Sequence, residues 1–239
     1  MSRYLLRLCL AWCVVVVTAS FAVAQDAGID LARYKAEIDA FRQWDAKNAA
    51  PADAVLFVGS STIRLWSTAE AFPSLPVINR GFGGSQILEV NHYIQDVTLK
   101  YKPAVVVFYA GDNDINAGRT PAQVEADYRE FVQRVLAVRA DTRVVFLAIK
   151  PSPARWDKWP AMRDANDRVR ALGDRINAER AGAPALFYAD VATPMLTADG
   201  QTQAHLYADD GLHLSAAGYA SWNRVLAPLL DRLDRVRTR

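Results

Sequence analysis

Apolar residues along this chain gather in five short runs that are continuous rather than alternating with polar positions. Continuous runs rich in β-branched and aromatic residues are typical of strands in a parallel sheet that is covered on both faces. The pattern therefore predicts five strands, at residues 54–58, 76–78, 104–110, 143–149 and 185–189.

Between these runs, apolar residues recur every three or four positions, which predicts amphipathic helices. One helix starts at Thr120-Pro121, where Gln123 can complete a capping box. Its predicted buried positions are Val124, Tyr128, Phe131, Val135 and Val138. A second helix buries Met162, Ala165, Val169, Leu172 and Ile176, and Gly182 closes it. A third begins near Ser215 and includes Trp222, Val225, Leu229 and Leu230, while residues 25–50 form an outer helix with Tyr34, Ile38, Phe41 and Trp44 on its apolar face.

The alternation of strands and helices predicts a three-layer α/β/α sandwich around a five-stranded parallel sheet. Ligands on such sheets bind at the carboxyl ends of the strands. The polar turns at 59–61, 81–85 and 111–114 follow the first three strands, and residues 210–213 follow the fifth after a longer loop. We therefore expect these turns to meet at one edge of the sheet.

The N-terminal segment has the composition of a secretory signal. Arg3 and Arg7 precede an uncharged stretch, and Ala22-Val23-Ala24 matches the small-x-small cleavage pattern. The sequence thus predicts a signal peptide at residues 1–24, a single domain at 25–239, and a periplasmic or secreted protein. An uncleaved anchor is the alternative, because the uncharged stretch approaches the length of a membrane span; after cleavage no stable membrane span is expected.

Removing this segment changes the charge balance of the protein. The chain has 28 basic and 26 acidic residues, and the signal contains two arginines and no acid, so the mature chain would be balanced. Charge therefore gives no reason to expect nucleic acid as a partner. Both cysteines, Cys9 and Cys13, also lie in the signal, so the fold must depend on its core rather than on disulfides.

Asp210 and His213 provide the clearest candidate chemistry. Three residues apart in one turn, the carboxylate can hold one imidazole nitrogen while the other faces a serine, the arrangement of covalent acyl transfer. Ser60 and Ser61, at the end of the first predicted strand, are the candidate nucleophiles.

Other residues of the chain are alternatives for this site. Asp209 competes with Asp210, His92 is expected to have a surface or packing role, and His205 either lines the pocket or belongs to a loop. A metal site at Asp209, Asp210 and His213 lacks a second His or Cys at ligand spacing, so no metal or other cofactor is expected. A dinucleotide-binding turn is excluded because Gln86 replaces the last glycine of that motif.

Four blocks of sequence, in this order and at strand ends, resemble the SGNH or GDSL hydrolases, esterases built on a flavodoxin-like sandwich. They are residues 57–61, 79–85, 111–114 and 210–213, and the resemblance extends over about residues 54–220. It implies that Ser61 is the nucleophile, His213 the general base and Asp210 the residue that orients the base.

The resemblance also implies an oxyanion hole formed by the backbone N–H groups of Ser61 and Gly84 and the side chain of Asn113. The chain departs from the family at Ser60, where an aspartate is usual, which removes a carboxylate that would organise the neighbouring loops.

The expected function is an exported serine esterase that hydrolyses small-acyl esters, with acetyl as the leading choice, of carbohydrate or lipid. The blocks resemble most closely the branch that contains α-type subunits of platelet-activating-factor acetylhydrolase and bacterial acetylesterases. The alternatives are a lysophospholipase or thioesterase of the same fold, or a non-catalytic envelope-binding protein. The sequence leaves open the oligomeric state and whether residues 150–159, rich in Pro and Trp, form a lid.

Overall fold

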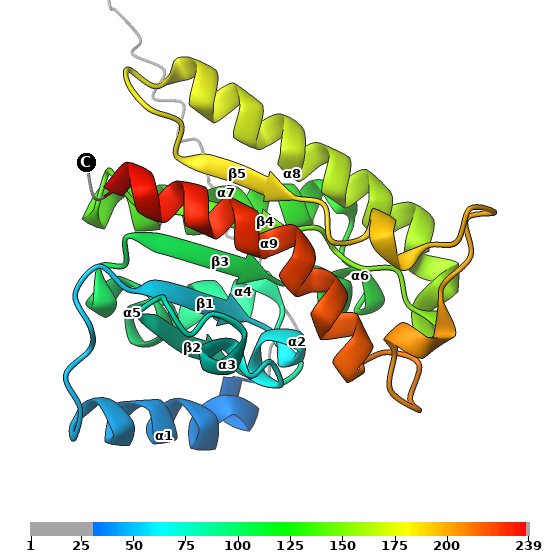
Figure 1. Cartoon of the computed structure of the whole chain (residues 1–239), viewed down its shortest axis with the longest axis horizontal. Helices are drawn as coiled ribbons and strands as arrows, with labels where there is room; N and C mark the ends of the chain where they lie inside the picture. The colour runs from blue at the N-terminus through cyan, green and yellow to red at the C-terminus, as the bar shows by residue number, and fades with distance from the viewer. Residues whose placement is uncertain (1–30, 238–239) are drawn as a thin grey trace, which may run out of the picture. The chain divides into compact units, whose positions relative to one another are not determined.

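Five parallel strands form the centre of the structure, a computed structural model that describes residues 31–237 (Figure 1). The strands are β1 (Val55–Gly59), β2 (Val77–Gly81), β3 (Val105–Tyr109), β4 (Arg143–Leu147) and β5 (Leu186–Ala189). They lie in the order β2-β1-β3-β4-β5, and all four neighbouring pairs are parallel. The predicted five-stranded parallel sheet is therefore confirmed. The expected signal segment and its cleavage site lie outside the described residues.

Helices cover both faces of this sheet. The α-helices are α1 (Lys35–Asp45), α2 (Ser61–Arg64), α3 (Thr68–Ala71), α4 (Ile87–His92), α5 (Ile94–Val97), α6 (Asp112–Asn116), α7 (Pro121–Val138), α8 (Trp159–Glu179) and α9 (Ala216–Arg237). The 3₁₀ helices are η1 (Leu31–Tyr34), η2 (Leu99–Tyr101), η3 (Pro153–Lys158), η4 (Thr193–Met195) and η5 (Ala204–Leu206). One layer contains α9 with α2 and α3, and the other contains α4, α6, α7 and α8 (Figure 1). This is the predicted three-layer α/β/α sandwich.

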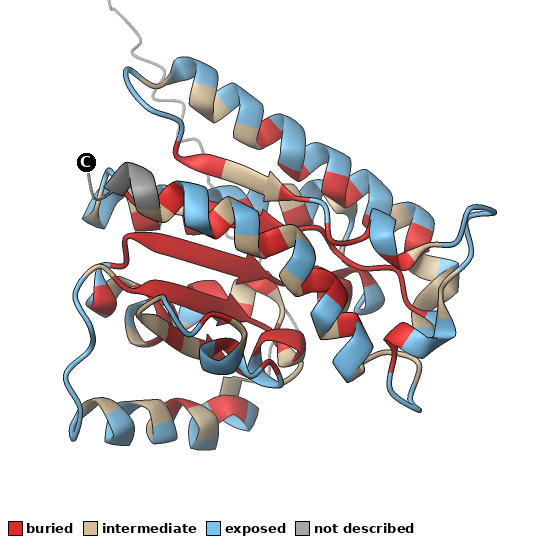
Figure 2. Cartoon of the chain, in the orientation of Figure 1, coloured by how far each residue is buried: buried red, intermediate tan, exposed pale blue. Residues whose placement is uncertain are grey.

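Burial on both faces of the sheet explains why the apolar runs of the strands are continuous. Every residue of β1 and β3 is buried between the two helical layers (Figure 2). Strand β2 is different, because it continues through Asn79 and Arg80, past the predicted end at residue 78. The guanidinium of Arg80 is buried, and it donates to the Asp45 carboxylate at 2.6 Å and to the Tyr101 hydroxyl at 2.6 Å. These tertiary partners allow a charged residue in the strand, and an apolar pattern cannot show them.

Helix α7 starts as its capping box predicts. The Thr120 hydroxyl accepts from the Gln123 N–H at 3.3 Å, and the Gln123 side chain accepts from the Thr120 N–H at 2.8 Å. Helix α8 ends at Glu179, before Gly182, and α9 begins directly after Ser215. The expectation that Val138 is buried was wrong: it is 44% exposed, because it is the last residue of α7.

The N-terminal elements η1 and α1 pack against the outside, as expected from their apolar face. Tyr34 and Ile38 are buried and Phe41 is partly buried, but Trp44 is 59% exposed, so its predicted burial was wrong. The helix is also shorter than residues 25–50 in its described part, since α1 ends at Asp45. Within residues 31–237, no helix is both long and apolar enough to cross a membrane.

Candidate active site

Ser61 and His213 are in hydrogen-bond contact although 152 positions separate them in the sequence. The Nε2 atom of His213 lies 3.0 Å from the Ser61 hydroxyl oxygen, and its Nδ1 atom lies 2.5 Å from a carboxylate oxygen of Asp210. The fold thus brings the predicted nucleophile, base and acid together in that order. A proton can pass from the hydroxyl to the imidazole while the carboxylate orients the ring.

The position of Ser61 follows from a close approach of β1 to β3. Gly59, the last residue of β1, has φ +137°, and a Cβ atom there would lie 1.8 Å from the carbonyl oxygen of Tyr109. That carbonyl accepts the N–H of Ser60 at 2.9 Å. The chain then turns directly into α2, with Ser61 as its first residue. The turn therefore presents the Ser61 hydroxyl at the carboxyl edge of the sheet.

Ser60, the alternative nucleophile, is fully buried. Its hydroxyl has no hydrogen-bond partner among the described residues and makes no contact with His213. The geometry therefore favours Ser61, because Ser60 cannot reach a substrate without opening the turn.

The turn that contains Asp210 is held by its own carboxylate. One oxygen of Asp210 accepts the N–H groups of Leu212 and His213, both at 2.9 Å, and the other faces the imidazole. The hydrogen bond from His213, followed by the two backbone N–H groups, lowers the pKa of Asp210 to about 2. Asp210 is thus ionised throughout the neutral range. Asp209 forms no hydrogen bond or ion pair with any residue that the structure describes.

Three hydrogen-bond donors stand at the neighbouring strand ends. The backbone N–H groups of Ser61 and Gly84 have no acceptor within residues 31–237. The side-chain amide of Asn113 donates one hydrogen to the Ser85 carbonyl at 3.1 Å, which leaves its second hydrogen for another acceptor. These are the donors that the sequence predicted for an oxyanion hole.

The glycine turn after β2 is clamped by the N-terminal elements. The Glu37 carboxylate accepts the Gly83 N–H at 3.1 Å, and the Gly84 carbonyl accepts from the Arg33 guanidinium at 2.7 Å and from the Tyr34 hydroxyl at 3.2 Å. The groups on either side of the Gly83–Gly84 peptide are therefore fixed. Sequence reasoning missed this clamp, because an amphipathic pattern shows which face is buried but not which polar residue bonds a distant turn.

Asn113 is supported by a cluster of buried charges. The Asp112 carboxylate accepts the Asn113 N–H at 3.0 Å and lies 3.1 Å from the Lys150 ammonium and 3.4 Å from the Arg155 guanidinium. The ammonium also donates to the Tyr109 hydroxyl at 3.1 Å. Burial alone would raise the pKa of Asp112, but Lys150 and then Arg155 outweigh it and hold the pKa below its ordinary value. No motif in the sequence indicated Lys150.

Asp114 connects the turn after β3 to the start of α4. It is fully buried, and its carboxylate accepts the Ile87 N–H at 2.9 Å, while its other oxygen has no partner within the described part of the chain. Burial raises the pKa of Asp114 to about 7, an effect that the hydrogen bond from Ile87 only partly opposes.

Residues 150–159 form a fixed wall beside the site. The Pro151 carbonyl accepts from the Tyr207 hydroxyl at 2.7 Å, and the Ala154 N–H donates to the Gly211 carbonyl at 3.1 Å. The segment is therefore bonded to the same loop that contains Asp210 and His213. The other two histidines, His92 and His205, are both exposed and make no contact with Ser61 or Asp210.

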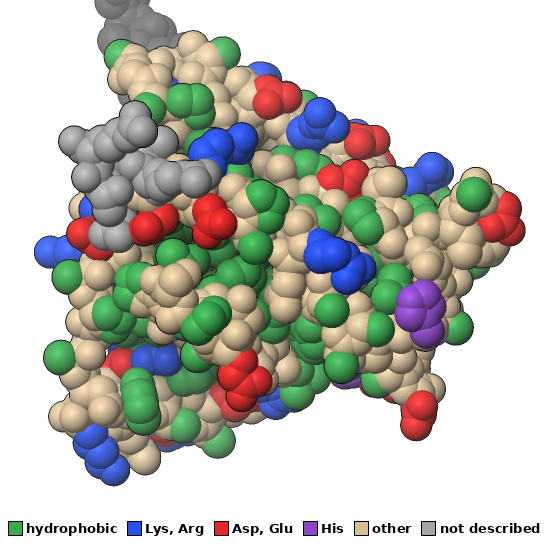
Figure 3. All heavy atoms as spheres, viewed as in Figure 1, with side chains coloured by type: hydrophobic (Ala, Val, Ile, Leu, Met, Phe, Trp, Pro, Cys, Tyr) green, Lys and Arg blue, Asp and Glu red, His purple; other side chains and the backbone are tan. Residues whose placement is uncertain are grey.

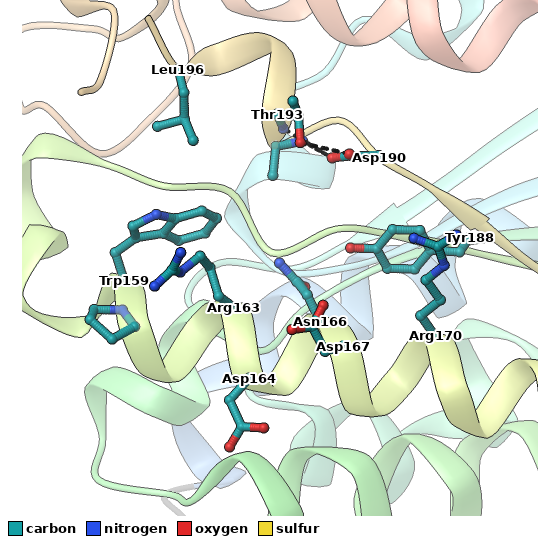
Figure 4. Close-up of a pocket in the computed structure, with 12 residues that line it drawn as sticks. Trp159, Arg163, Asp164, Asn166, Asp167, Arg170, Tyr188, Asp190, Thr193 and Leu196 are labelled. Atoms are coloured by element: carbon teal, nitrogen blue, oxygen red, sulfur yellow. Dashed lines mark hydrogen bonds between the residues drawn. The ribbon is translucent and has the colours of Figure 1, made fainter. Parts of the chain in front are cut away.

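A cavity of about 660 Å³ lies elsewhere, between α8 and the end of β5 (Figure 4). Trp159, Arg163, Arg170 and Tyr188 line it, and none of the predicted site residues does. The site itself is open, since the side chains of Asp210 and His213 are 48% and 29% exposed. Among residues 31–237 no cluster of three His, Cys, Asp or Glu side chains could hold a metal ion.

Known proteins resemble this chain in sequence and in fold. The model of the GDSL-like Lipase/Acylhydrolase family matches residues 64–221. Platelet-activating factor acetylhydrolase IB subunit alpha1 of Pongo abelii is 33% identical over 195 residues, which are 79% of each chain.

Solved structures show the same fold. A candidate platelet activating factor from Streptococcus pneumoniae superposes with a TM-score of 0.72 at 21% identity, covering 84% of this chain and 94% of that one. A GDSL-like lipase from Bacteroides thetaiotaomicron superposes with a TM-score of 0.68 at 18% identity, covering 85% and 98%.

The buried carboxyl group of Asp114 makes a testable contribution to stability. Its pKa of about 7 lies above the value of about 3.9 expected in the unfolded chain. As the pH rises, the unfolded state loses this proton first, so the free energy of unfolding contributed by Asp114 falls between about pH 4 and 7. We expect Asp114→Asn, which keeps an acceptor for the Ile87 N–H, to lose less stability than the wild type between pH 5 and pH 8.

Urea unfolding at the two pH values measures this difference. The matched control is Asp157→Asn, which changes an exposed carboxylate and should keep the wild-type pH dependence. An equal loss of stability in Asp114→Asn and wild type would contradict the raised pKa of Asp114.

Proposed function

Because the chain belongs to the GDSL-like lipase/acylhydrolase family, we propose that it is an exported esterase that removes small acyl groups through an acyl-enzyme. Family membership makes it a serine ester hydrolase. The observation that carries the finer proposal is the contact chain from Asp210 through His213 to Ser61.

In the first step, the Ser61 hydroxyl oxygen attacks the ester carbonyl carbon while His213 Nε2 takes the hydroxyl proton. The tetrahedral intermediate then collapses, the bond from carbon to the alcohol oxygen breaks, and His213 returns the proton to the departing alcohol. In the second step, water attacks the acyl-enzyme with the same base, which releases the acid and restores Ser61. Asp210 stays ionised and stabilises the imidazolium in both steps.

The free donors at Ser61, Gly84 and Asn113 support stabilisation of the negative charge that forms on the carbonyl oxygen. Losing one such donor typically costs about 2.7–4 kcal/mol of transition-state stabilisation. The buried cluster beneath Asn113 adds to this support. Lys150 and Arg155 carry two positive charges against the one negative charge of Asp112, so a net positive charge lies beside the hole.

The acyl group and the export of the protein are proposed from the similarity to a relative and from the N-terminal sequence. The relative from Pongo abelii is named an acetylhydrolase, which supports acetyl as the acyl group. The pattern of residues 1–24 supports export to the periplasm or the medium, where esters of carbohydrate or lipid would be the substrates.

Replacing the nucleophile tests the mechanism. Ser61→Ala should lower kcat for 4-nitrophenyl acetate by about four orders of magnitude or more, with an unchanged circular dichroism spectrum. A fluorophosphonate probe should label the wild type on Ser61. Ser60→Ala is the control: its hydroxyl has no partner in the described structure, so labelling and turnover should persist. Loss of labelling in Ser60→Ala alone would move the nucleophile to Ser60.

The pH profile tests the base. We expect kcat/KM to fall as the solution becomes more acidic, because a protonated imidazole cannot act as the general base. Asp210, with a pKa of about 2, does not titrate between pH 5 and 8 and should not contribute to the fall. His92→Ala and His205→Ala, which change exposed histidines, should keep the profile. A flat profile from pH 5 to 8 would contradict a neutral histidine base.

A series of 4-nitrophenyl acyl esters tests the acyl group. Acetate should give the highest kcat/KM, at least about ten-fold above octanoate, which corresponds to about 1.4 kcal/mol. A maximum at octanoate, or faster turnover of acyl thioesters, would instead favour the lysophospholipase or thioesterase alternative. Acetylated sugars and lysophospholipids assayed beside this series identify the natural alcohol.

A further inference from the structure

Lys150 is a buried cation beside the turn that contains Asn113. Figure 3 shows lysine and arginine side chains at the surface of one face of the molecule, whereas the Lys150 side chain is only 1% exposed. Its ammonium donates to the Asp112 carboxylate and to the Tyr109 hydroxyl, both at 3.1 Å. A buried ion pair is often no more stabilising than well-packed apolar side chains would be, because both ions lose their hydration. Stability alone therefore does not explain the lysine.

The backbone on both sides of Lys150 is held by hydrogen bonds. The Asn166 side chain of α8 accepts the Ile149 N–H at 2.7 Å and donates to the Ile149 carbonyl at 2.9 Å. On the other side, the Pro151 carbonyl accepts from the Tyr207 hydroxyl at 2.7 Å. The base of the lysine side chain is therefore fixed, and its ammonium stands at a defined place at the end of β4.

The Asp112 carboxylate connects this ammonium to Asn113. One of its oxygens faces Lys150, and the other accepts the Asn113 N–H at 3.0 Å. Because a carboxylate is planar and rigid, holding one oxygen restricts the position of the other. The Asn113 side-chain amide is held in turn by the Ser85 carbonyl at 3.1 Å. The contacts that start at Lys150 thus end on the residue whose second amide hydrogen is a proposed donor to the oxyanion.

Arg155 is a second cation near Asp112, but its contact is looser. Its guanidinium lies 3.4 Å from the carboxylate oxygen that also faces Lys150, and the nitrogen concerned makes no hydrogen bond within residues 31–237. Lys150 and Arg155 give the cluster the same charge, whereas of the two only Lys150 hydrogen-bonds the carboxylate. A comparison of the two residues therefore separates an effect of charge from an effect of position.

We propose that Lys150 is a positioning residue for the oxyanion hole: through Asp112 it holds Asn113 where its amide can donate to the negative oxygen of the tetrahedral intermediate. The inference rests on the proposed esterase function and adds to it a residue that is too deeply buried to touch the substrate. The contribution of Lys150 belongs to the transition state, in which charge forms on the oxygen, and not to binding of the ester. Loss of the lysine should therefore lower kcat and leave KM nearly unchanged.

Lys150→Met removes the cation and keeps much of the side-chain volume. Asp112 and Arg155 remain as a balanced pair, so we expect the variant to fold, which circular dichroism and urea unfolding check. Complete loss of one oxyanion donor costs about 100-fold to 1,000-fold in kcat, so a displaced donor should cost about thirty-fold. The KM for 4-nitrophenyl acetate should change by less than about three-fold, because an interaction made only in the transition state is lost.

A double-mutant cycle with Asn113→Ala tests the route from Lys150 to the oxyanion hole. If Lys150 acts through the Asn113 amide, Lys150→Met should cost less than about three-fold in kcat once that amide is absent, because coupled residues are not additive. A lysine that only stabilised the fold would not show this coupling. An undiminished loss in the Asn113→Ala background would overturn the proposal.

Two matched variants each remove one positive charge. Arg155→Met removes the looser cation and should lower kcat far less than Lys150→Met does. Lys158→Met changes an exposed lysine of η3 that pairs with Asp157, and it should keep the wild-type kinetics. Equal losses in Lys150→Met and Arg155→Met would assign the effect to charge and would overturn the positioning role.

Lys150→Leu, with a shorter apolar side chain, takes the place of Lys150→Met in the same cycle if the methionine variant does not fold. The expected loss of kcat and the expected coupling to Asn113→Ala are the same. A folded Lys150 variant with the wild-type kcat would overturn the inference and leave the esterase intact. Absence of ester hydrolysis by the wild type would instead overturn the proposed function, and this inference with it.

Discussion

The contact between the end of β1 and the Tyr109 carbonyl is the constraint on which the site depends. A Cβ atom at Gly59 would lie 1.8 Å from that oxygen, so any other residue would push the two central strands apart. Because all residues of β1 and β3 are buried, such a movement would open the core as well. Ser61 faces His213 only because this approach is so close. The close approach of β1 to β3 therefore determines both the packing of the sheet and the position of the Ser61 hydroxyl.

Around this point the site is supported from two directions. Arg33, Tyr34 and Glu37 fix the glycine turn from outside the sheet, whereas Lys150, in the loop after β4, fixes the Asp112 side chain. Buried ions are costly unless each has a partner, and a paired cluster permits few alternative arrangements of the chain. The first set of contacts ends on the backbone of Gly83 and Gly84, and the second reaches the backbone N–H of Asn113 through the Asp112 carboxylate. The two oxyanion turns are therefore positioned without using the catalytic side chains themselves.

The sequence patterns predicted the features that depend on residues close together in the chain. Apolar runs gave all five strands, and the capping box gave the start of α7, because both signals lie within a few residues. Four short motifs nominated Ser61, Asp210 and His213, which the structure brings into contact. The sequence could not find Lys150 or the clamp from Arg33, since their partners are 38 and 51 positions away. Residue type could not rank Ser60 below Ser61, because the two serines differ in burial and in the contact with His213, which only the folded chain shows.

The clamp on the glycine turn has a consequence for where the protein can be shortened. Arg33, Tyr34 and Glu37 belong to the first described elements, which lie outside the sheet, and they bond the turn that follows β2. A chain trimmed to begin after Glu37 would keep its strands and its triad residues, but it would lose the buried side chain of Tyr34, whose ring packs against Phe82 at a centroid distance of 5.0 Å. It would lose the bonds that fix Gly83 and Gly84. The amino-terminal elements of this fold can therefore affect turnover through the glycine turn and stability through Tyr34, so the functional unit and the folding unit share this boundary.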